Sequence, residues 1–297
     1  MSRPKLLPAD AIGASRRPGV LCALWLLRAA LAVAIAAPFG AIAEHALGAF
    51  PRGDAMLFEP GGMYLVEVSR VGHLGLAAAS REALLIALVA AYLGLVPLAA
   101  ELDALGRSGR VTLASSLSAG LRPLGALSWL LGASVAATVA LAFLAGAVVT
   151  AIGGAVNVHA SDRTVDLVRL SIVAVAAACA VAVGVVHDFA RAAAVRTGSA
   201  ALTALYAGAA TFGRAPLRAV WNWALWAVTA LAVVALATVA TARIGVATGP
   251  RFAAVAVVHQ VAALALVFLR ASWLAWVLAR VAERADASAF HPDDRAD

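Results

Sequence analysis

Six long apolar runs constrain this chain more than any other feature. They cover Val20–Ala43, Ala83–Ala100, Leu127–Ile152, Val168–Val186, Ala219–Ala242 and Phe252–Leu278. A helix crosses the hydrocarbon core, about 30 Å thick, with about 20 apolar residues that rise 1.5 Å each. The strands of a membrane barrel are shorter and alternate polar with apolar residues, whereas these runs are apolar on all sides. We therefore predict an all-α polytopic transmembrane helical bundle with six spans.

The predicted bundle occupies residues 20–284, between an N-terminal segment, 1–19, and a polar tail, 285–297. Only 13% of the residues are charged, against about 25% in soluble domains. The net charge is +7, but the arginines lie between the apolar runs and do not gather on one polar face, as they would in a nucleic-acid-binding domain. The predicted partner is therefore the lipid bilayer, including its anionic lipids, and no nucleic acid.

The basic residues also predict an orientation. With six spans, fourteen of them fall on the side of the two termini and six on the other side. All seven tryptophans also fall towards the side of the termini, where their amphipathic rings anchor helices at the interface. Because positive residues stay in the cytoplasm, we predict a bacterial cytoplasmic (inner) membrane protein with both termini cytoplasmic.

Three segments with a common pattern indicate an internal repeat. Arg-Pro combinations at residues 16–18, 122–123 and 214–216 each precede an odd-numbered run, with Trp25, Trp129 or Trp221 in its first turns. Small-residue amphipathic stretches, Val111–Leu121 and Ala200–Phe212, precede the second and third of these runs. The pattern predicts three tandem hairpins, each introduced by a cytoplasmic interfacial helix. Convergence is the alternative, because every helix that leaves the cytoplasm favours Arg, Pro and Trp there.

Two short segments carry a resemblance to a known group of proteins. They are His187–Val195 (HDFARAAAV) and Leu57–Gly62 (LFEPGG). Both are similar to segments of bacterial multi-pass membrane proteins related to the membrane domain of glycerophosphodiester phosphodiesterases. In that family a span ends in an Asp and Arg pair and continues as an Ala-rich interfacial helix. The soluble catalytic domain of those enzymes has no counterpart in the sequence, so the resemblance implies no enzymatic activity.

No recognised catalytic or cofactor motif occurs in the sequence. The six histidines are scattered, and the two cysteines lie inside apolar runs without a metal-binding spacing. We therefore expect neither an enzyme, nor a cofactor, nor a metal site.

Charged and polar residues within the spans are the best candidates for a site, because such groups are costly in a bilayer. Arg28 and Arg270 lie well inside the first and sixth runs, and Glu101 and Asp188 follow the second and fourth. These four are a candidate cavity for an anionic headgroup or solute. The alternative is that the arginines snorkel or pair with the acids to hold the bundle together. His259 and Gln260 are a second candidate, an intramembrane polar site whose alternative is a hydrogen bond to a neighbouring helix.

The sequence leaves two functions open. The first is a non-enzymatic membrane protein that serves as a scaffold or assists a lipid-related process, alone, as a homo-oligomer or with a membrane-protein partner. The second is a transporter or permease subunit for an anionic or lipidic substrate. Small residues in the spans permit close helix packing in either case.

Overall fold

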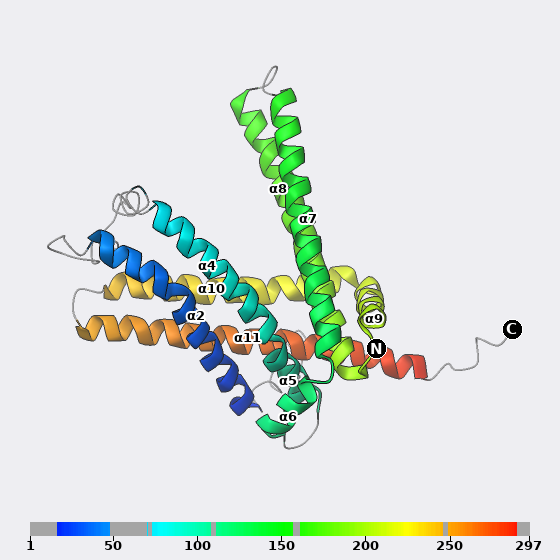
Figure 1. Ribbon diagram of the computed structural model, residues 1–297. Helices are drawn as coiled ribbons and strands as arrows, with labels where there is room; N and C mark the ends of the chain where they lie inside the picture. Colours follow the sequence, from blue (N-terminus) through cyan, green and yellow to red (C-terminus); the bar gives the residue numbers. More distant parts are fainter. Residues whose placement is uncertain are drawn as a thin grey trace.

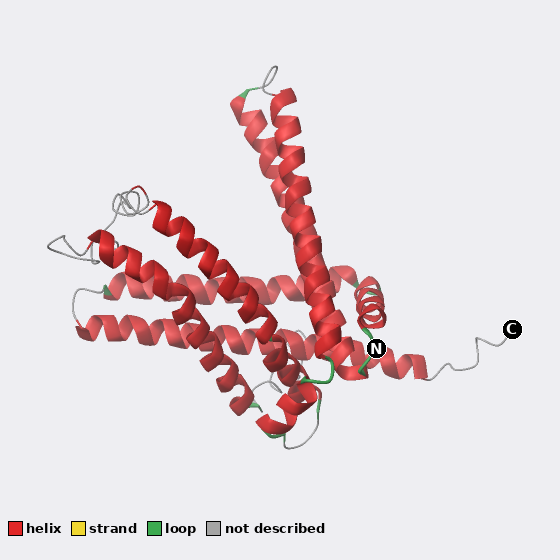
Figure 2. Cartoon of the chain, viewed as in Figure 1, coloured by secondary structure: helices red, strands yellow, loops and turns green. Residues whose placement is uncertain are grey.

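The computed structural model describes residues 17–47, 70, 73–107, 111–156, 161–245 and 249–289. These residues are helical apart from short connections, and no strand occurs among them (Figure 1, Figure 2). Six helical segments are long and apolar enough to cross a membrane. The predicted all-α polytopic architecture is therefore confirmed.

The spans form three antiparallel hairpins. They are α2 (Pro18–Leu47) with α4 (His73–Leu93) and α5 (Leu95–Gly106), α7 (Leu124–Val156) with α8 (Asp162–Thr197), and α10 (Pro216–Ile244) with α11 (Gly249–Ala289). The hairpins meet at one end, and the α7–α8 hairpin points away from the other two, whose outer ends lie on the same side of the view (Figure 1). The last helix continues to Ala289, which is within the segment expected to be a polar tail. The rest of that tail lies outside the described residues.

The buried core lies where the hairpins meet. We call this end the base; it consists of α5, the short helices α6 (Leu113–Gly120) and α9 (Ala201–Gly213), the last turns of α8 and the C-terminal half of α11. Trp273, Leu274, Val277, Leu278 and Val281 recur at helical spacing on α11 and are all buried there. One face of α11 thus supplies the centre of the base.

A break between α4 and α5 directs the second span into the base. Pro97 has no N–H and its ring crowds the carbonyl of the residue four positions earlier, so the helical hydrogen-bond ladder is interrupted. Gly94 occupies the break, and a Cβ there would lie 2.9 Å from the Ala90 carbonyl oxygen. The predicted run Ala83–Ala100 is therefore two helices in the structure.

The helices expected at Val111–Leu121 and Ala200–Phe212 are present as α6 and α9. Each packs on the end of the preceding span, α6 on α5 and α9 on α8. In both pairs a glycine permits close contact of the backbones. A Cβ on Gly120 would lie 3.0 Å from the Val96 carbonyl oxygen, and one on Gly208 would lie 2.5 Å from the Ala190 nitrogen. The segment that would introduce the first hairpin lies outside the described residues.

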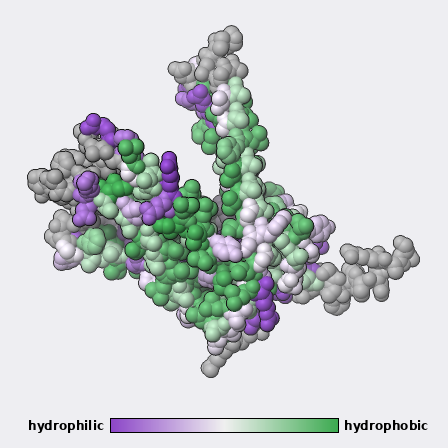
Figure 3. All heavy atoms as spheres, viewed as in Figure 1, coloured by the Kyte–Doolittle hydropathy of each residue, from purple (hydrophilic) through white to green (hydrophobic). Residues whose placement is uncertain are grey.

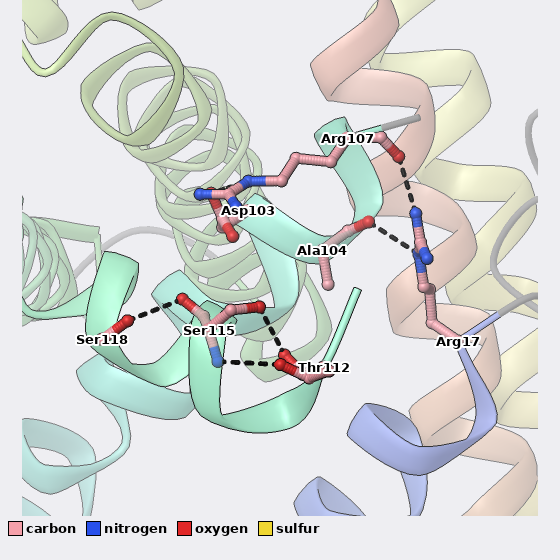
Figure 4. Close-up of polar contacts among 7 residues, drawn as sticks. All are labelled: Arg17, Asp103, Ala104, Arg107, Thr112, Ser115 and Ser118. Carbon is pink, nitrogen blue, oxygen red and sulfur yellow. Dashed lines mark hydrogen bonds and ion pairs between the residues drawn. The ribbon is translucent and has the colours of Figure 1, made fainter. Parts of the chain in front are cut away.

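Two arginines from opposite ends of the chain donate to backbone carbonyls of the base. Arg17 donates from Nε to the Ala104 carbonyl at 2.9 Å and from Nη2 to the Arg107 carbonyl at 2.7 Å, as Figure 4 shows. Arg284 donates from Nη1 to the Ala207 carbonyl of α9 at 2.9 Å. Carbonyls in the last turn of a helix lack intrahelical donors and carry partial negative charge. The Arg17 side chain therefore caps the C-terminus of α5.

The outer parts of the spans expose apolar side chains. Phe143, Leu170, Leu231 and Leu236 are among the large hydrophobic residues with most of their surface uncovered. Apolar surface runs along the protruding α7–α8 hairpin, with hydrophilic side chains near its tip (Figure 3). In a bilayer such surface is covered by lipid or by another membrane protein.

Candidate functional site

Asp188 is the centre of a polar cluster inside the base. Its side chain is only 5% exposed. Arg270 of α11 donates from Nη1 to Oδ2 at 2.8 Å and from Nη2 to Oδ1 at 2.6 Å. Trp273, one turn further along α11, donates from Nε1 to Oδ2 at 2.8 Å. This bidentate geometry, with a third donor, is among the strongest arrangements for a buried carboxylate.

Arg191 completes what we call the Asp188 cluster (Asp188, Arg191, Arg270 and Trp273). It lies one turn after Asp188 on α8, with Nη1 3.8 Å from Oδ1. Its Nε is buried without a hydrogen-bond partner among the described residues. The cluster therefore contains two cations and one anion, and one of the cations retains a free donor.

Aromatic rings enclose the cluster on the side of the base. Trp273 and Trp276 stack at 5.3 Å, and Phe189 meets both rings edge-on. Phe189 and Trp273 are almost completely buried. The rings cover the Asp188–Arg270 pair on this side, and such partial burial strengthens its electrostatic attraction.

In the described part of the chain, the carboxylate of Glu101 is buried without the hydrogen bonds that the carboxylate of Asp188 accepts. It is 1% exposed, and neither carboxylate oxygen has a hydrogen-bond partner among the described residues. Arg28 and Arg270 are the cations that attract its charge. The structure thus groups the four residues of the predicted cavity, but only Asp188 and Arg270 form a direct ion pair among the described residues.

Two cavities adjoin the Asp188 cluster. One of about 450 Å³ lies between α7–α8 and α10–α11 and is lined by Ser134, His187, Asp188, Arg191, Trp223 and Arg270, among others. The other, of about 310 Å³, lies between α2 and the α10–α11 hairpin and is lined by Arg28, three tryptophans and Arg270, with apolar residues. Trp223 and Arg270 border both. Each combines charged groups at one end with apolar walls, a combination that suits an amphipathic molecule.

His259 and Gln260 do not join this site. Both are exposed on the outer part of α11. His259 lies eleven residues before Arg270, which corresponds to about 16 Å along a helix. Within the described residues, neither side chain forms a hydrogen bond or an ion pair.

Several residues of the site were not singled out from the sequence. Trp273 counts there only among the seven tryptophans at the interface, and Arg191 only as part of the His187–Val195 segment. His187, whose Nε2 is buried and unpartnered among the described residues, lines the larger cavity. The spacing Arg270-x-x-Trp273 places both donors on one helical face, and that was the available signal.

The chemistry of the site is that of charge and hydrogen bonding. Among the described residues, no group of three or more His, Cys, Asp or Glu side chains is placed to hold a metal ion. The arrangement can bind an anion at Arg191 or Arg28, or it can hold the hairpins together through Asp188 and Arg270.

No family model matches the chain, and neither a curated protein nor a solved structure matches it. The resemblance to the membrane domain of the phosphodiesterases therefore stays a prediction.

Proposed function

We propose that the protein is a non-enzymatic, multi-pass protein of the bacterial inner membrane, with both termini in the cytoplasm, that acts as a scaffold in a membrane or lipid-related process. The observation that carries the proposal is the bidentate pairing of Asp188 with Arg270. This pair joins two hairpins beside the stacked rings of Trp273 and Trp276. A scaffold needs such a fixed junction, from which the apolar hairpins reach lipids, a membrane-protein partner or a second copy of the chain.

A second candidate is a transporter or permease subunit for an anionic or lipidic substrate. The cavity of about 450 Å³ beside Arg191 and His187 favours this function. So does Arg28, which is exposed and in no ion pair among the described residues. Under this alternative Arg28 and Arg191 would bind the anionic part of the substrate.

Native mass spectrometry of protein released from native-membrane nanodiscs separates the two functions. The wild type is compared with Arg28→Ala and Arg270→Ala, and Arg163→Ala at the far end of α8 serves as a matched control. For a scaffold we expect the same partner protein, or the same bare protein, and the same lipids from the wild type, Arg28→Ala and the control. Arg270→Ala should lower the unfolding temperature, because it leaves Asp188 buried without its main partner.

The scaffold proposal is overturned if an anionic lipid or solute copurifies with the wild type and the control but is absent from Arg28→Ala. Circular dichroism must then show that Arg28→Ala keeps its helicity and unfolding temperature. That outcome would assign Arg28 to a substrate cavity and favour transport.

A further inference from the structure

A second group of charges lies where α9, α10 and α11 meet. A pocket of about 180 Å³ there is lined by four arginines and one acidic residue, together with Phe189 and Trp276, among others: Arg214, Arg218, Arg280, Arg284 and Glu283. We call it the arginine pocket. It is separate from the cavities beside the Asp188 cluster, with which it shares none of these four arginines.

The charges of the arginine pocket are not balanced by the described residues. Arg280 pairs with Glu283 at 2.7 Å and lies over the Trp276 ring at 5.5 Å, and its Nε is buried with no hydrogen-bond partner there. Arg284 is engaged with the Ala207 carbonyl. Arg214 and Arg218 are exposed and form no ion pair within the described residues. Among the described residues that line the pocket, one carboxylate thus accompanies four arginines, and an anionic ligand would supply the missing charge.

The first turn of α10 adds to the positive potential. Ala215 is the N-cap and Pro216 the first helical residue, and both Arg214 and Ala215 line the pocket. The N–H groups of a first helical turn have no intrahelical acceptor, and the helix dipole is positive there. Helix N-termini bind phosphate groups for this reason, and arginine matches phosphate with two parallel hydrogen bonds.

The size of the pocket limits what can enter. Pockets for whole small ligands hold about 300–1,000 Å³, whereas this one holds about 180 Å³. The pocket therefore suits a headgroup, and the rest of the ligand must lie outside it.

An apolar stripe begins beside the pocket. Arg218, Trp221, Leu225 and Val228 recur at spacings of three and four along α10 and so share one face. Trp221 is 71% exposed, and Leu225 and Val228 are exposed as well. A molecule with its anion at Arg218 would lay its remaining length on apolar side chains, as a phospholipid does.

We propose that the arginine pocket binds the phosphate of an anionic phospholipid, with the acyl chains along Trp221, Leu225 and Val228 of α10. The inference rests on the proposed function, which places the base at a membrane. It adds the class of lipid that the scaffold would bind.

The test is lipid retention by the purified full chain in nanodiscs that contain equal amounts of phosphatidylglycerol and phosphatidylcholine. Native mass spectrometry measures the ratio of the two lipids that stay bound. Each arginine near a membrane contributes about 1 kcal/mol to the binding of anionic lipid, so Arg214→Gln/Arg218→Gln should lower the preference for phosphatidylglycerol roughly 30-fold. Arg243→Gln/Arg251→Gln removes two exposed arginines from the opposite ends of the same helices and should keep the preference.

Further comparisons identify the source of the phosphate and control for misfolding of the variants. Arg214→Lys/Arg218→Lys keeps the charges and should retain most of the preference. An equal ratio for the wild type and the Gln variant, or an equal loss in the Arg243/Arg251 control, would overturn the proposal. Displacement of the lipid by millimolar inorganic phosphate would also overturn it, in favour of a soluble anion. This experiment measures lipid preference in variants of Arg214 and Arg218. The scaffold test measures bound partner proteins and the effect of Arg28→Ala. The two proposals can therefore fail independently.

Discussion

At the scale of single residues, two buried carboxylates of the base differ sharply in how they are satisfied. Both oxygens of Asp188 accept strong hydrogen bonds from α11, whereas neither oxygen of Glu101 has a partner within the described residues. Removing one member of a buried ion pair leaves the other as an uncompensated charge. Asp188 is therefore the residue on which the stability of the base depends most directly.

We predict that Asp188→Asn lowers the free energy of unfolding by about 3–5 kcal/mol, because Arg270 loses its counter-charge. Asp166→Asn is a matched control on the same helix. Its pair with Arg169 is 3.7 Å long and the Asp166 side chain is 76% exposed, so the loss should be about 0–1 kcal/mol. Denaturant unfolding of both variants in the same detergent measures the difference. Equal losses would show that the Asp188 pair contributes no more than a surface pair.

The sequence singled out four charged residues that the fold places near one another, but it did not predict which of them are in contact. Arg28, Arg270, Glu101 and Asp188 stand out because charges inside spans are rare. The choice of Asp188 as the partner of Arg270 could not be predicted, since 82 residues separate them in the chain and only the packing of α11 on α8 joins them. Arg214, Arg218, Arg280 and Arg284 were read only as topological charges, although each pair has the spacing of neighbours on one helical face.

At the scale of elements, close packing of α9 on α8 depends on a missing side chain. Gly208 lies against the backbone of Phe189 and Ala190, next to Asp188. The apolar runs predicted the spans, and the small-residue amphipathic stretches predicted the short helices α6 and α9. The break at Gly94 was not predicted, although Pro97 three residues later is a local signal for it. The apolar runs did not predict the continuation of α8 to Thr197, and only the resemblance implied an Ala-rich helix there.

We predict that Gly208→Ala destabilises the protein by about 1–3 kcal/mol, as expected for overpacking, because the new Cβ would lie 2.5 Å from the Ala190 nitrogen. Gly213→Ala, in the same helix, meets no atom within 4 Å and should be neutral or slightly stabilising. Unfolding temperatures of the two variants provide the comparison. A loss in Gly213→Ala as large as that in Gly208→Ala would contradict the packing argument.

At the scale of the whole molecule, the three hairpins contact one another mainly at the base. The apolar run lengths predicted six spans, and the structure agrees. Hydropathy carries no information about the angles between hairpins, because the exposed sides of the spans are as apolar as the lipid tails around them. The divergence of the α7–α8 hairpin from the other two in Figure 1 was therefore beyond prediction from the sequence.

The proposed orientation predicts which end of the molecule reacts with a reagent outside the cell. In a background without Cys22 and Cys179, Ser118→Cys places a thiol on α6 at the base and Ser161→Cys places one at the start of α8. A membrane-impermeant maleimide should label the second variant in intact cells, and the first only after the membrane is opened. Labelling of Ser118→Cys in intact cells would show that the base faces outward.

The length of α8 has a mechanical consequence. This helix runs without proline through 36 residues, which corresponds to about 54 Å, and so behaves as a stiff rod that extends beyond a hydrocarbon core of about 30 Å. Rods change their tilt when the bilayer thins or thickens. Because Asp188 ties α8 to α11 near one end, a change of tilt rotates the α7–α8 hairpin about that point. In a bilayer of changing thickness, the angle between the α7–α8 and α10–α11 hairpins would then change about the Asp188 cluster.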